Sequence, residues 1–217
     1  MRNCIKSGSL ILVAVLGVGA SYFWAEVPTR GTPSLKYDSA TGHLKEVAFD
    51  SAHNGRNDSV AYMDGTRVER IEIDEDGDGK VDRWEFYDAD RRLQRASFSR
   101  QHNGVLDATA FYGADGEIQR VEISTAGDGR FNRVEFYQSG SLTRVEEDTN
   151  GDGRVDKWET YATGPGGSSE PRIVVAAFDD AFRGSPTRRF VYSPNGTLHV
   201  EVDPDGDGIF EEPAAEN

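Results

Sequence analysis

The chain has 217 residues, which is enough for one sizeable domain or a short array of repeats. It carries 38 acidic and 24 basic residues, so its formal net charge is −14. Because binding to phosphates needs a basic face, this balance argues against nucleic acid as a partner. Cys4 is the single cysteine, so the sequence predicts no disulfide framework.

An uncharged, largely apolar segment, residues 7–25, lies between Lys6 and Glu26. At about 1.5 Å per helical residue it is long enough to cross a hydrocarbon core of about 30 Å. Basic residues precede it, which predicts that everything after it is extracytoplasmic, in the periplasm or at the cell surface. Tyr22-Phe23-Trp24 favours an uncleaved helix anchored in the cytoplasmic membrane, whereas Val18-Gly19-Ala20 offers a signal-peptide cleavage site. Both readings stay open.

The sequence thus predicts three parts. Residues 1–25 form a signal anchor or signal peptide helix, 26–42 a linker and lead-in, and 43–217 a β-repeat domain.

The predicted domain is internally repetitive. Its period is 24 or 25 residues, except for one step of 31 that contains the low-complexity segment 164–169. The period is marked by loop glycines: Gly55, Gly79, Gly104, Gly129, Gly153, Gly184 and Gly208. Apolar residues two apart, such as Ile71 and Ile73, indicate half-buried strands. Dipeptides typical of tight hairpin turns, such as Asp64-Gly65 and Asn195-Gly196, lie between the units. The fold predicted is all-β, an antiparallel meander of about seven β-hairpin repeats.

One loop has the spacing of a calcium site. Carboxylates stand at positions 1, 3, 5, 9 and 12 of a twelve-residue stretch with glycine at position 6, which lets a short chain wrap hard oxygens around Ca²⁺. The expected ligands are Asp74, Asp76, Asp78, the backbone carbonyl of Lys80, Asp82 through water, and a bidentate Glu85.

This spacing resembles the EF-hand calcium loop, and it recurs. The second copy offers Asp148, Asn150, Asp152, the carbonyl of Arg154, Asp156 and Glu159. A third copy offers Asp203, Asp205 and Asp207 but has Ala214 where the bidentate glutamate belongs, so we expect it to be weaker or empty. The alternative is that these Asp-Gly clusters are simply good turns. A turn does not require a glutamate six residues after its glycine.

Length separates these loops from an ordinary EF-hand. A 25-residue period leaves about 13 residues for both flanks of a twelve-residue loop, which suits two strands better than two helices. The segments 87–93 and 192–198 resemble the YD repeats of bacterial surface and toxin proteins. That resemblance implies a curling β-sheet without catalytic residues of its own.

Other units keep the strand pattern and lose the acids: Ser99, Gln101 and Asn103 replace them in one unit, and Ser124 and Ala126 in another. This separation indicates that the hairpin is the structural unit and that metal is added to some copies. Four histidines, at positions 43, 53, 102 and 199, do not fall at metal-ligand spacing and are expected to be exposed turn residues.

We therefore expect a non-enzymatic calcium-binding scaffold or interaction module with Ca²⁺ as its cofactor. It would contact the membrane through residues 7–25 and bind protein partners, as an accessory subunit of an integral membrane complex. One alternative is a secreted or surface-attached adhesin or toxin-associated repeat protein. Another is a glycan-acting hydrolase, since paired carboxylates catalyse that reaction, although acids that occur regularly in several turns do not form one unique pair.

Overall fold

The computed structural model describes residues 33–50, 52–163 and 171–213. The predicted membrane or signal helix at 1–25 lies outside these residues. Within them, no helix is both long and apolar enough to cross a membrane.

The described chain forms fourteen β-strands. They are β1 (Ser34–Tyr37), β2 (Leu44–Phe49), β3 (Ser59–Asp64), β4 (Arg67–Ile73), β5 (Arg83–Tyr87), β6 (Leu93–Phe98), β7 (Ala108–Tyr112), β8 (Ile118–Ile123), β9 (Arg133–Gln138), β10 (Ser141–Glu147), β11 (Lys157–Thr163), β12 (Pro171–Phe178), β13 (Arg188–Tyr192) and β14 (Leu198–Val202).

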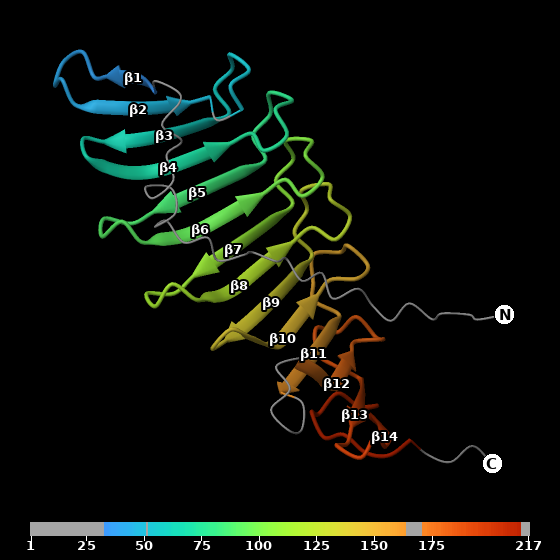
Figure 1. Ribbon diagram of the computed structural model, residues 1–217. Helices are drawn as coiled ribbons and strands as arrows, with labels where there is room; N and C mark the ends of the chain where they lie inside the picture. Colours follow the sequence, from blue (N-terminus) through green and yellow to red (C-terminus); the bar gives the residue numbers. More distant parts are fainter. Residues whose placement is uncertain (1–32, 51, 164–170, 214–217) are drawn as a thin grey trace. The chain divides into compact units, whose positions relative to one another are not determined.

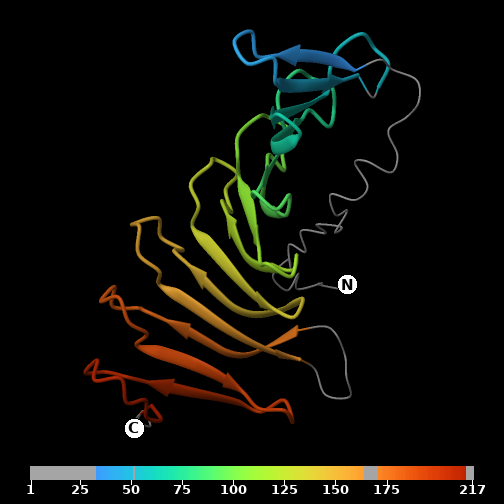
Figure 2. The ribbon, with the colours of Figure 1, turned by 90° about the vertical axis from the view of Figure 1, so that its left-hand side faces the viewer.

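All fourteen strands belong to one sheet, and each pairs antiparallel with the strands before and after it in sequence. Figures 1 and 2 show them following one another in chain order. The predicted all-β meander is therefore confirmed. The sheet begins earlier than predicted, because β1 lies inside the lead-in 26–42.

The connections alternate between tight turns and long loops, and the two kinds lie at opposite ends of the strands (Figure 1). Tight turns join β3 to β4 and β9 to β10, and the second has positive φ at Ser139 (48°) and Gly140 (74°), as a primed hairpin turn requires. The other ends carry long loops, each of nine residues where it joins two strands: 50–58, 74–82, 99–107, 124–132, 148–156 and 179–187. A seventh follows β14 and returns to it at Glu211, whose backbone pairs with Val202.

One face of the sheet, here called the glutamate face, contains a buried cross-strand row. Glu85 lies between Ile71 and Ala96 in this row, and both flanking residues are buried. On the same strand, Arg83 and the Tyr87 hydroxyl both donate to the Glu85 carboxylate. Burial and the nearby Glu85 charge raise the pKa of Tyr87. The buried carboxylate is therefore paired on its own strand, as a buried charge must be.

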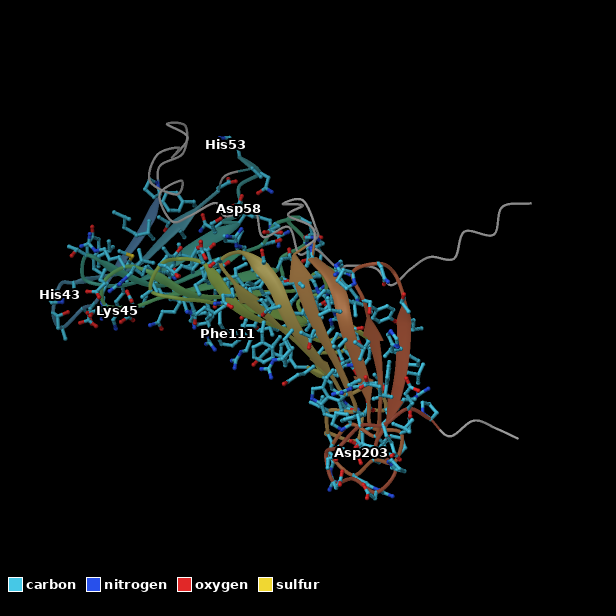
Figure 3. The ribbon with its side chains drawn as sticks, turned by 90° about the horizontal axis from the view of Figure 1, so that it is seen from below. His43, Lys45, His53, Asp58, Phe111 and Asp203 are labelled. Atoms are coloured by element: carbon cyan, nitrogen blue, oxygen red, sulfur yellow. The ribbon has the colours of Figure 1, made fainter. Side chains whose placement is uncertain are left out.

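The opposite face, here called the arginine face, carries a ladder of aromatic and arginine side chains on successive strands. Arg95 of β6 stacks 4.0 Å from the Phe86 ring, and Arg120 of β8 stacks 4.3 Å from the Phe111 ring. Figure 3 labels Phe111 on this face. Each such cation–π contact stabilises neighbouring strands by about 0.5–1 kcal/mol at an exposed site. The ladder gives the recurring phenylalanines Phe86 and Phe111 a packing role on this face.

Candidate metal centre

The nine-residue loops are stacked by a regular set of backbone hydrogen bonds. In each neighbouring pair, the N–H at position 1 of one loop donates to the carbonyl at position 9 of the loop before it. Two examples are Ser99 N to Asp82 O at 2.7 Å and Asp179 N to Asp156 O at 2.9 Å. Each loop is therefore hydrogen-bonded directly to the next, and the loops form one row at the same ends of the strands. Figure 3 labels His53 and Asp58 in the first of these loops and Asp203 in the last.

In loop 74–82, the side chain at position 1 organises the backbone. The Asp74 carboxylate accepts the N–H of Gly77 at 2.7 Å and of Gly79 at 2.8 Å. Both glycines have positive φ, 79° and 95°, which curls the loop around its own first residue. The curl gathers oxygens: ligand atoms of Asp74, Asp76 and Asp78 all lie within 4.8 Å of one another. This is the arrangement that the sequence predicted for positions 1, 3 and 5.

Position 9 of the same loop holds a buried acid. Asp82 is 2% exposed, and its Oδ2 accepts the N–H of Glu75 at 3.0 Å. Among the described residues, its Oδ1 has no hydrogen-bond partner. No arginine or lysine in this part of the chain forms an ion pair with it; the one ionisable partner is His102, whose Nδ1 lies 3.2 Å from Oδ2. The hydrogen bond that His102 donates to the Asp82 carboxylate raises the pKa of His102.

Three of the loops that lack the predicted ligands differ at position 9, either in the residue itself or in its charged partner. In loop 99–107, Asp107 is fully buried, and the Arg100 guanidinium of the same loop lies 2.8 Å from it and neutralises it. In loops 124–132 and 179–187, position 9 is the neutral Asn132 or Thr187. A buried carboxylate needs a cation nearby. In loops 99–107, 124–132 and 179–187, position 9 is therefore either paired with a cation of its own loop or uncharged.

Loop 148–156 repeats the geometry of loop 74–82. Asp148 accepts the N–H of Gly151 at 2.7 Å and of Gly153 at 2.8 Å. Asp156, at position 9, is 7% exposed and accepts two hydrogen bonds from Thr149, from N–H at 3.0 Å and from Oγ1 at 2.8 Å. Its Oδ2 has no hydrogen-bond partner in the described chain, and no lysine or arginine there pairs with it.

The third predicted site is half formed. Asp203 is 2% exposed and holds the backbone of its loop as Asp74 does, and its ligand atoms lie within 4.8 Å of those of Asp205 and Asp207. Position 9 is Glu211, which is exposed and pairs through its backbone with Val202. This loop therefore offers the front acids without the buried acid behind them.

The remaining predicted residues are at positions 7 and 12, and the ligand predicted at position 7 is the backbone carbonyl, which stays a prediction. Lys80 places its Nζ 2.8 Å from Asp78, and Arg154 donates its backbone N–H to Asp152 at 2.8 Å. Glu85 is not a member of the Asp74 group, because position 12 falls within β5, where its oxygens face Arg83 and Tyr87. Glu159 is placed in the same way in β11, where the Tyr161 hydroxyl donates to it at 2.9 Å and Lys157 lies 3.0 Å away.

Sequence spacing missed one residue. His102 joins Asp76 and Asp82 in a group whose ligand atoms lie within 4.8 Å of one another, although it comes from the next loop. The sequence signal for this contact is the 25-residue period, which stacks loop 99–107 on loop 74–82 and so brings His102 to Asp82.

Comparison with known proteins adds little. No family model matches the chain, and no curated protein matches its sequence. Among solved structures, a GtfA/B complex bound to UDP and GlcNAc is similar to it with 13% identity and a TM-score of 0.41, over 57% of this chain and 25% of that one. A porin-like protein from Bacteroides uniformis has 11% identity and a TM-score of 0.23, over 84% of this chain and 87% of that one. Both similarities are weak.

Proposed function

We propose that this protein is a non-enzymatic, calcium-binding β-repeat scaffold, in which loops 74–82 and 148–156 each hold one Ca²⁺. One observation carries the proposal. In two of the three loops with acids at the front positions, a buried position-9 acid, Asp82 or Asp156, lacks an arginine such as the one that neutralises Asp107. A divalent ion bound by hard oxygens supplies the missing charge.

The ion would act by setting the shape of the row of loops. Without it, the carboxylates of Asp74, Asp76 and Asp78 repel one another at close range. With it, four acids converge on one charge, and the loop above, bonded through Ser99 to the Asp82 carbonyl, is fixed in turn. Ca²⁺ that binds the folded chain alone stabilises it by about 2.7 kcal/mol per site at a hundredfold excess over the Kd.

The expected cellular setting follows from the sequence. Extracellular calcium fills even sites with a Kd of about 10⁻⁴–10⁻³ M, so an extracytoplasmic scaffold needs no tight site. Residues 7–25 would anchor it in the cytoplasmic membrane, where it would serve as an accessory subunit of a membrane complex. Mass spectrometry of the mature N-terminus separates this from a secreted adhesin. We expect an intact Met1 end, and a chain that starts near Ser21 contradicts the anchor.

Calorimetric titration of the chelator-treated protein with Ca²⁺ tests the metal proposal. We expect two principal sites, one lost in Asp82→Asn and the other in Asp156→Asn. Asp107→Asn is the matched control, because Asp107 occupies the same loop position but is already paired with Arg100. Two sites that survive in both loop variants, or an absence of calcium uptake by the folded wild type, would overturn the proposal.

A further inference from the structure

Loop 74–82 differs from loop 148–156 in what lies beside its buried acid. His102, at position 4 of the following loop, brings its Nδ1 to 3.2 Å from Asp82 Oδ2. The residue at the same position of the loop that follows loop 148–156 is Phe182, which is exposed and offers no ligand atom. The two loops that carry His102 and Phe182 are seated by the same backbone bond to the loop below, so the difference lies in the side chain.

The group formed by His102, Asp76 and Asp82 has the donors of a different metal. Three ligand atoms, one imidazole nitrogen and two carboxylate oxygens, lie within 4.8 Å of one another. Imidazole is a poor ligand for Ca²⁺, which takes oxygens, and a good one for Zn²⁺ and similar ions. Three protein ligands and one water complete the four-coordinate shell that Zn²⁺ adopts.

A second observation points to a cation at this place. The side chain of Asp82 is 1% exposed, and in the described residues its Oδ1 receives no hydrogen bond. The side chain of His102 is 45% exposed, so solvent and ions can reach the group from that side. The oxygen of Asp82 that faces the accessible imidazole is Oδ2, and Oδ1 behind it has no partner, so a cation bound between Asp82 and His102 would compensate the buried carboxylate.

We infer that loops 74–82 and 99–107 together form a site for a divalent transition-metal ion of the Zn²⁺ class, held by Asp76, Asp82 and the Nδ1 of His102. The inference rests on the proposed function in one respect, since Asp76 and Asp82 also serve the calcium site of loop 74–82. The two ions therefore compete for that loop. Zn²⁺ has a further effect that Ca²⁺ lacks, because its imidazole ligand ties two neighbouring loops together by their side chains.

Loop 148–156 does not bind Zn²⁺ in this way. Its position 3 is Asn150, whose amide oxygen replaces the carboxylate of Asp76, and Phe182 replaces His102. The chain therefore provides an internal control. Loops 74–82 and 148–156 have the same backbone geometry, but the first can bind both ions and the second only Ca²⁺.

Titration of the metal-free full-length protein with Zn²⁺, in the presence of millimolar Ca²⁺, tests the inference. We expect one Zn²⁺ site in the wild type, a weakening of at least about tenfold in His102→Ala, and no change in His53→Ala. His53 is a matched control, because it occupies the same loop position with nearly the same φ, 55° against 51°, so both substitutions change the backbone strain equally. NMR of the imidazole nitrogens should show Zn²⁺ bound at Nδ1 of His102.

The reverse substitution strengthens the test. Asn150→Asp combined with Phe182→His should add a second Zn²⁺ site, and a folded double variant without one counts against the geometry. Zn²⁺ affinity that is unchanged in His102→Ala overturns the inference and leaves the calcium proposal intact. Conversely, Zn²⁺ uptake through His102 in a protein that takes up no Ca²⁺ would refute the calcium proposal alone.

Discussion

Replacing Asp82 by asparagine should make the protein more stable without calcium and remove one calcium-dependent increment of stability. The wild-type carboxylate is 2% exposed, and no arginine or lysine among the described residues pairs with it. An amide of the same shape keeps an oxygen for the Glu75 N–H and removes the buried charge. We expect Asp82→Asn to gain about 1–3 kcal/mol in chelator, because an uncompensated buried charge costs several kcal/mol and the nearby His102 offsets part of that.

Calcium should cancel that gain. At a hundredfold excess over its Kd, one bound ion adds about 2.7 kcal/mol to the wild type and nothing to the variant at this loop. Urea unfolding in chelator and in millimolar Ca²⁺ measures both values. Asp107→Asn should instead lose about 1–3 kcal/mol in both buffers, because it leaves Arg100 without its partner. If Asp82→Asn is destabilised equally in chelator and in calcium, the carboxylate serves the loop backbone and not a metal.

Further predictions concern the other buried groups. Arg100→Met should destabilise the protein by about 3–5 kcal/mol in urea unfolding without added metal, because Asp107 is then left buried and unneutralised; a loss below about 1 kcal/mol would contradict that role. Glu85→Gln should lose about 1–3 kcal/mol in chelator and in calcium alike, whereas a tenfold fall in calcium affinity would show that Glu85 turns to the loop as a ligand. Tyr87 should stay neutral in a spectrophotometric titration up to pH values where free tyrosine ionises. Its raised pKa favours the phenol in the folded state, so the associated stability is complete below about pH 10 and falls as pH rises through the folded pKa. Gly77→Ala should cost about 1–2 kcal/mol of unfolding free energy, since φ is 79° there although no atom blocks a Cβ; an unchanged midpoint would refute the need for glycine.

The sequence by itself determined the strand pattern and the two kinds of turn. Alternation of apolar and polar residues is a local property of a half-buried strand, and dipeptides such as Ser139-Gly140 fix a turn within two residues. The front acids of loop 74–82 were equally readable, because Asp74, Asp76 and Asp78 belong to one short loop that curls on its own backbone bonds.

The tertiary structure decided what these loops touch. It placed Glu85 on the glutamate face beside Tyr87, because position 12 falls within a strand whose side chains alternate between two faces. It also buried Asp82 and brought His102 to it, through loop stacking that sequence spacing within one loop does not show. Burial and contact between loops depend on how neighbouring hairpins align, and that alignment is a cooperative property of the whole sheet.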